Sequence, residues 1–110
     1  MSRLHYCTKR IIEYSHTAYF CKMKEQINLF IKDLFEIVYY SDEYIEYSDI
    51  VEIERESLVD GLEKLKAYSD KDLPKSIIER GYTKDDLVKF FEDVLRGSDP
   101  NNYMITLEWY

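Results

Sequence analysis

Glycine, proline and cysteine are scarce in this 110-residue sequence, which has three glycines, two prolines and two cysteines. No glycine or proline precedes Gly61, so nothing in the first half indicates a flexible linker. No apolar run approaches the roughly 18 residues of a membrane-spanning helix, and the first residues lack the apolar segment of a signal peptide. We predict a single compact domain, residues 1–110, in the cytoplasm.

Motifs of catalysis and nucleotide binding are absent as well. The sequence has no P-loop, no glycine-rich dinucleotide pattern, no nucleophile-elbow pattern and no zinc-protease motif. Carboxylates are so numerous that an acid–base or metal-binding pair could be drawn in many places, and none stands out. We therefore predict that the protein is not an enzyme and has no cofactor. A small metal-dependent enzyme is kept as an alternative hypothesis.

The residues that favour transition metals lie close together in the sequence, at His5, Cys7, His16 and Cys21. They lack the short Cys–Cys or His–His spacing that is typical of zinc sites. If residues 4–21 form one helix, the two cysteines lie about 21 Å apart, whereas a hairpin could bring them together. We predict no metal site and two reduced thiols, as is usual in the cytoplasm.

Acidic residues, in contrast, are abundant and are concentrated in the middle of the chain. The net charge is −7, and residues 41–70 alone carry ten acidic and three basic side chains. Residues 42–63 contain a single cation, Arg55, and nine carboxylates: Asp42, Glu43, Glu46, Asp49, Glu52, Glu54, Glu56, Asp60 and Glu63. Direct nucleic-acid binding is disfavoured, because contacts to phosphates require clustered lysine and arginine.

Tyrosine is the other abundant residue, with eleven tyrosines against five phenylalanines and one tryptophan. Four of them, at positions 39, 40, 44 and 47, lie among the carboxylates of the acidic segment. Such a face would attract a basic protein by electrostatic steering and hold it by aromatic contacts. The predicted partner-binding residues are Tyr40, Asp42, Glu43, Tyr44, Glu46, Tyr47, Asp49, Glu52 and Glu54. The alternative is a solvated acidic strand that provides solubility and edge protection.

The apolar pattern of the N-terminal half predicts one helix and leaves one segment ambiguous. Apolar residues at helical spacing predict a helix over residues 22–39: Ile27, Phe30, Ile31, Leu34, Phe35 and Val38. Residues 4–21 fit either a helix or a hairpin that turns near Ser15 and His16. We favour the helix, because no glycine, asparagine or aspartate marks a turn there.

From Tyr44 the apolar pattern changes to a period of two, which predicts either one strand over residues 44–54 or a hairpin that turns at Ser48 and Asp49. Downstream, the signals at helix ends are clearer. One helix is predicted to begin at Ser57, with Asp60 as its capping-box partner, and a second to cover residues 72–81. A third is predicted to run from Thr83, with Asp86 as its capping-box partner, to Gly97. A turn over 98–102 and a strand over 103–110 follow. The fold class is therefore α+β, with three or four helices packed on one face of a small antiparallel β-sheet.

In its size, acidity, tyrosine content and lack of catalytic motifs, the chain resembles small acidic inhibitors. These are phage anti-defence proteins such as anti-CRISPRs, and immunity proteins that neutralise nuclease toxins. If a phage encodes the protein, the resemblance implies that it acts in the host cytoplasm. The resemblance implies a steric or nucleic-acid-mimic inhibitor whose face around residues 39–63 blocks a basic nucleic-acid-handling protein, such as a nuclease or a CRISPR effector. It assigns no role to any individual residue.

Overall fold

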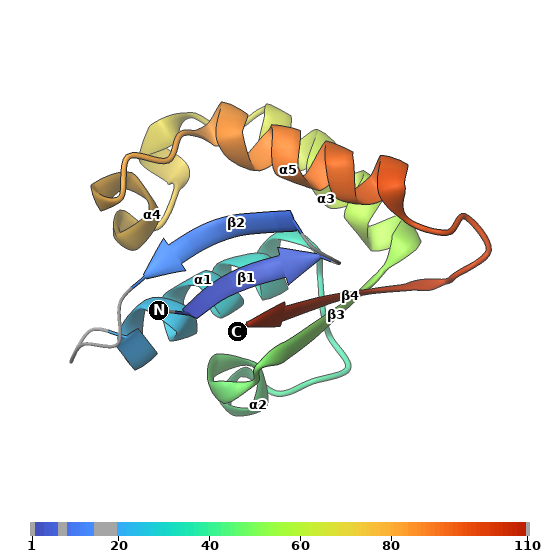
Figure 1. Cartoon of the computed structure of the whole chain (residues 1–110), viewed down its shortest axis with the longest axis horizontal. Helices are drawn as coiled ribbons and strands as arrows, with labels where there is room; N and C mark the ends of the chain where they lie inside the picture. Colours follow the sequence, from blue (N-terminus) through green and yellow to red (C-terminus); the bar gives the residue numbers. More distant parts are fainter. Residues whose placement is uncertain (1, 7–8, 15–19, 110) are drawn as a thin grey trace.

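A computed structural model describes residues 2–6, 9–14 and 20–109 of the chain. Four antiparallel strands form one sheet in the order β2-β1-β4-β3 (Figure 1). The strands are β1 (Ser2–Tyr6), β2 (Lys9–Tyr14), β3 (Ile50–Glu54) and β4 (Met104–Trp109). The described helices are α1 (Phe20–Leu34), α2 (Asp42–Tyr47), α3 (Arg55–Lys66), a 3₁₀ turn (Asp70–Asp72), α4 (Lys75–Glu79) and α5 (Lys84–Gly97).

The α+β class is confirmed, with helices packed on a small antiparallel sheet. Figure 1 shows α1 behind the sheet and α3, α4 and α5 above it. One helix, α2, was not predicted. Among the described residues, none of the helices combines the length and the apolar character needed to cross a membrane.

Strands β3 and β4 present opposite faces to the core and to solvent. Val51 pairs with Leu107 and Ile53 with Ile105, and all four side chains are buried together with Trp109. Between them, the alternate positions of both strands point to the other side of the sheet, as strand geometry requires. That open side carries Ile50, Glu52, Glu54, Met104, Thr106 and Glu108, of which none is buried.

The predicted helix over residues 4–21 is wrong, because β1 and β2 form an antiparallel pair there. The hairpin alternative placed its turn at Ser15 and His16, but the two strands are joined through residues 7–8. Strand β1 also pairs with β4, where Leu4 lies opposite Trp109. A strand partner about 100 residues away leaves no signal in a local pattern.

Of the four residues that could ligate a transition metal, only His5 and Cys21 lie within the described part of the chain. Cys7 and His16, like the proposed turn at Ser15, lie outside the described residues. Within the described part of the chain, no three His, Cys, Asp or Glu side chains come close enough to hold a metal ion. The absence of a metal site therefore stays a prediction.

Two predicted helix boundaries before residue 70 are wrong. The helix predicted over 22–39 ends at Leu34, and Glu36 adopts a left-handed conformation with φ of 51° that stops it. The helix predicted from Ser57 begins at Arg55, directly after β3, without the predicted cap. Its inward face is formed by Leu58, Leu62 and Leu65, which are all buried.

The C-terminal predictions are confirmed more closely. The helix predicted over 72–81 is shorter than expected, because α4 covers Lys75–Glu79 with Pro74 as its N-cap, and Gly81 follows it with a φ of 82° that suits glycine. Thr83 and Asp86 form the predicted capping box at the start of α5. The predicted turn and terminal strand follow, and β4 alternates as expected.

Candidate functional site

Residues 44–47, predicted as the start of a strand or hairpin, belong instead to the short helix α2, which begins at Asp42. The Ser41 hydroxyl caps its first turn by accepting a hydrogen bond from the Tyr44 backbone at 3.1 Å. The helix is anchored to the protein by Ile45, which is fully buried. The strand predicted from the apolar alternation is therefore found only at residues 50–54. Ser48 and Asp49 connect α2 to this strand, β3.

We call the surface formed by the 39–40 loop, α2 and β3 the acidic tyrosine surface; it comprises Tyr39, Tyr40, Glu43, Tyr44, Glu46, Tyr47, Glu52 and Glu54. Three of its rings form a continuous row. Tyr39 and Tyr40 meet edge to face at 4.9 Å, and Tyr40 stacks on Tyr44 at 4.6 Å with an interplanar angle of 22°. Aromatic pairs at such distances are mutually stabilising, so each ring of the row helps to hold its neighbour in place.

Two of the predicted binding carboxylates are paired with lysines of α1. Asp42 forms an ion pair with Lys32 at 3.0 Å, and Asp49 forms one with Lys24. For the four glutamates of the acidic tyrosine surface, no ion pair is found within the described part of the chain. These glutamates are therefore the carboxylates that remain available to a basic partner.

The one cation of the acidic segment, Arg55, does not neutralise this surface. Its guanidinium donates to the Asn102 carbonyl at 2.9 Å, the Ser98 hydroxyl at 2.8 Å and the Asp99 carbonyl at 2.5 Å. Those three bonds hold the turn between α5 and β4. Arg55 is thus used to fix the end of the sheet, and the excess negative charge around it persists.

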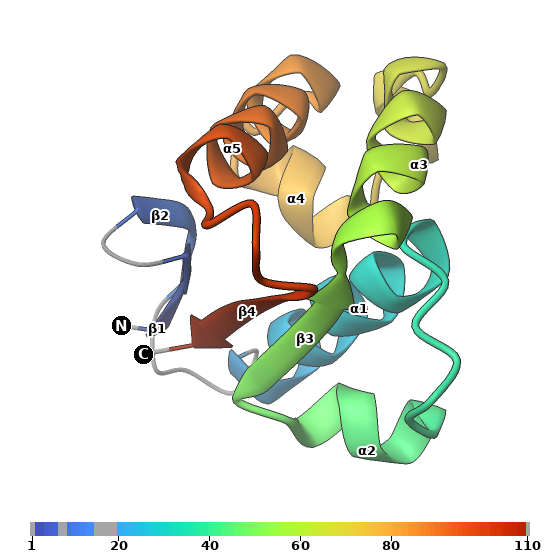
Figure 2. The same cartoon turned by 90° about the vertical axis from the view of Figure 1, so that its right-hand side faces the viewer.

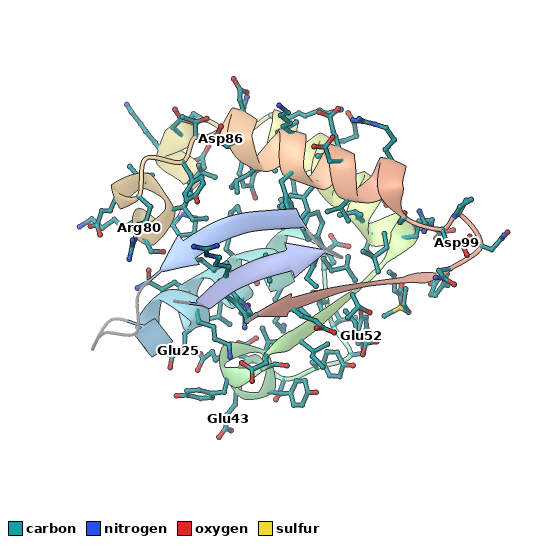
Figure 3. All side chains as sticks on the ribbon, viewed as in Figure 1. Glu25, Glu43, Glu52, Arg80, Asp86 and Asp99 are labelled. Carbon is teal, nitrogen blue, oxygen red and sulfur yellow. The ribbon has the colours of Figure 1, made fainter. Side chains whose placement is uncertain are left out.

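The carboxylates that lie together in the structure differ from those of the predicted acidic face. Asp60 and Glu63 lie on α3, which leads away from α2 (Figure 2), so they do not belong to the same surface. Glu25 of α1 borders the acidic tyrosine surface instead, because it lies beside Tyr47 and raises the pKa of that phenol. Figure 3 shows Glu25, Glu43 and Glu52 at the α2 side of the molecule, away from Arg80, Asp86 and Asp99.

The outer edge of β3 is closed by two hydroxyl groups. The Tyr39 hydroxyl donates to the Glu52 carbonyl at 2.8 Å. The Ser48 hydroxyl accepts from the Ile50 backbone at 3.2 Å and donates to its carbonyl at 2.5 Å. These side chains occupy backbone groups that an added strand would need. The edge-protection role of the alternative hypothesis thus belongs to Tyr39 and Ser48, and a partner would contact side chains rather than this edge.

Tyr39 gives the surface a response to alkaline pH. Burial, followed by the Glu54 carboxylate, raises the pKa of Tyr39 to about 12, above the value of about 10 for an unfolded tyrosine. Because the folded-state pKa is the higher one, the associated stabilisation is complete below about pH 10 and is lost as the pH rises toward 12.

We expect the free energy of unfolding, measured by urea denaturation, to fall between about pH 10 and pH 12. The fall should be shallower in Tyr39→Phe, and identical slopes would contradict this assignment.

A shallow depression of about 480 Å³ lies on α2 within the acidic tyrosine surface. Its lining residues are Ser41, Glu43, Tyr44, Tyr47 and Ser48. The two tyrosine side chains are largely solvent-exposed, at 53% for Tyr44 and 63% for Tyr47. The depression thus combines aromatic walls with a free carboxylate, an arrangement suited to binding a cation.

Comparisons with protein-family models, curated proteins and solved structures find no match to this chain. No role is therefore transferred from a relative. The acidic tyrosine surface itself carries the functional argument.

Proposed function

We propose that the protein is a small acidic inhibitor that binds a basic surface of a nucleic-acid-handling protein through its acidic tyrosine surface. In this proposal it acts as an anti-CRISPR or another phage anti-defence protein does, by occupying a surface that the target needs. The observation that carries the proposal is the group of glutamates without a cation (Glu43, Glu46, Glu52 and Glu54), set around a row of tyrosines.

Electrostatics supports a basic partner. Carboxylates of one sign on one face create a field that steers an oppositely charged protein and raises its association rate. The exposed rings then supply contact area that carboxylates alone lack, since tyrosine is enriched among the residues that dominate binding energy. Charge provides attraction at long range, and the rings provide the close contact.

The distribution of the carboxylates favours a steric block over mimicry of a nucleic-acid backbone. Of the four glutamates of the acidic tyrosine surface, only Glu52 and Glu54 lie on one face of a strand, where alternate residues are about 6.6 Å apart. Glu43 and Glu46 follow the helical path of α2 instead. The row of carboxylates that could replace the phosphates of a nucleic acid is therefore shorter than the strand predicted over residues 44–54 would have provided.

An immunity protein that neutralises a nuclease toxin is the second candidate, because the same surface fits a basic nuclease. The two functions differ in the partner rather than in the physics of binding. Gene neighbourhood separates them: an adjacent toxin gene favours immunity, and surrounding phage genes favour anti-defence.

The proposal is tested by affinity capture of nucleases and CRISPR effectors at low and high salt, with the wild type and two triple variants. Reversal of charge at Glu46, Glu52 and Glu54 to lysine is expected to weaken binding at least a hundredfold, because the attractive surface becomes repulsive. The control replaces Asp60, Glu79 and Asp85 by lysine, which changes the net charge equally but outside the surface. Equal losses in the two variants, or tight binding that ignores the first reversal, would overturn the proposal.

A further inference from the structure

We propose that the depression on α2 binds an arginine side chain of the basic partner, whose guanidinium group stacks on the rings of Tyr44 and Tyr47 and faces Glu43. This inference rests on the proposed function and names the group on the partner that the surface recognises. The site lies at the lower side of the molecule in Figure 3, where Glu43 is labelled.

The two rings are placed to act together. Tyr44 and Tyr47 are three residues apart on one helix, so their side chains leave α2 on neighbouring positions of one face. Tyr40 stacks on Tyr44 at 4.6 Å and holds that ring, while more than half of the Tyr44 side chain stays exposed. The free ring surface is electron-rich and attracts a cation placed over it.

Among the residues that the structure describes, no lysine or arginine lines the depression. Lys32 and Lys24 of α1 are engaged by Asp42 and Asp49, neither of which lines the depression. Among the described residues, Glu43 has no ion-pair partner. A cation supplied from outside would therefore meet both a free carboxylate and two aromatic walls.

Arginine fits this arrangement better than lysine. Its guanidinium is planar, stacks on aromatic rings, and can donate two parallel hydrogen bonds to one carboxylate. A lysine ammonium is compact and strongly hydrated, so it gains less from the ring faces and more from charge alone. The tyrosine walls thus predict a preference for arginine over lysine, whereas attraction by charge alone would predict equal binding of the two.

The test compares two peptides of equal charge, acetylated (Arg-Gly)₄ amide and (Lys-Gly)₄ amide, by titration calorimetry at low salt. The wild type is expected to bind the arginine peptide roughly fivefold more tightly. Tyr47→Leu should remove this preference and leave the lysine affinity within about twofold, because the carboxylates are unchanged. Tyr47→Phe should retain the preference, because it keeps the ring.

Tyr103→Leu is the matched control. Tyr103 is 58% exposed and lies beside the Glu54 and Glu56 carboxylates, which raise its pKa, but it does not line the depression. Its replacement should leave the arginine preference intact. Equal affinity of the wild type for both peptides, or the same loss in Tyr103→Leu and Tyr47→Leu, would overturn the arginine site and leave the proposed function standing. Binding of neither peptide would contradict the proposed function as well.

Discussion

Replacement of Gly61 by alanine is expected to lower the free energy of unfolding by about 2–3 kcal/mol. A β-carbon at this position of α3 would lie 2.3 Å from Cδ1 of Phe35 and 2.7 Å from the Leu34 carbonyl oxygen. The Phe35 ring has little room to yield, because it is 1% exposed and packs edge to face on Phe91 at 4.8 Å. Helix propensity alone would predict a gain of about 1 kcal/mol, so the steric clash decides the sign.

Gly97→Ala is the control for this prediction. Gly97 is the last residue of α5, and nothing lies within 4 Å of the position that its β-carbon would take. Urea denaturation followed by circular dichroism should show Gly97→Ala within about 0.5 kcal/mol of the wild type. A Gly61→Ala variant as stable as Gly97→Ala would show that α1 and α3 can move apart freely.

The features that sequence predicts well here are those set by neighbouring residues. The capping box of Thr83 and Asp86 forms within one helical turn, and Gly81 satisfies a local need for positive φ. The alternation of β4 follows from exposure of one sheet face and burial of the other. Each of these signals lies within a few residues and agrees with the tertiary packing, so the local prediction is correct.

Helix α2 was missed because a distant contact decides it. Residues 44–48 alternate in a way that suits a strand, and six residues are too few for helical periodicity to prevail. The helical form is selected by burial of Ile45 and by hydrogen bonds from Asn28, 17 and 20 residues earlier in the chain. Nothing in the local pattern shows those bonds.

The candidate site could be predicted only where sequence neighbours are also spatial neighbours. Tyr40, Glu43, Tyr44 and Glu52 come together on the acidic tyrosine surface, since the loop, α2 and β3 follow one another along the chain. Glu25 could not be predicted, because the packing of α1 on α2 brings it there. The packing of helices thus determines which residues border the surface, whereas the residues at its centre can be predicted from the sequence.

The second large effect is expected at Asn28. Its side-chain amide donates to the Ile45 carbonyl at 2.8 Å and to the Ser48 carbonyl at 3.0 Å, and its oxygen accepts from the Trp109 indole at 2.8 Å. Asn28 is fully buried, so water cannot replace these bonds. It joins α1, the second half of α2 and β4 through one side chain.

Asn28→Leu keeps the approximate volume but removes these three hydrogen bonds, while the Ile45 carbonyl keeps its 3.3 Å bond from the Ser48 backbone N–H. Each bond lost from a buried group costs about 1–3 kcal/mol, so we expect the free energy of unfolding to fall by about 3–5 kcal/mol. Asn101→Leu is the matched control, because Asn101 is exposed in the turn before β4 and should change stability by less than about 0.5 kcal/mol. Urea denaturation measures both, and similar values for the two variants would contradict the role assigned to Asn28.

Asn28→Leu should also act on the site itself. A six-residue helix is not stable alone, so α2 depends on its attachment to Asn28. Amide exchange at Ile45 and Ser48 should therefore accelerate, and partner binding should weaken even under conditions where the variant stays folded. Gly61→Ala provides the comparison, because it disturbs the contact between α3 and the end of α1 and should leave the affinity of the folded protein unchanged. If both variants lost affinity equally, binding would depend on global stability, and the geometry of α2 would not be the determinant.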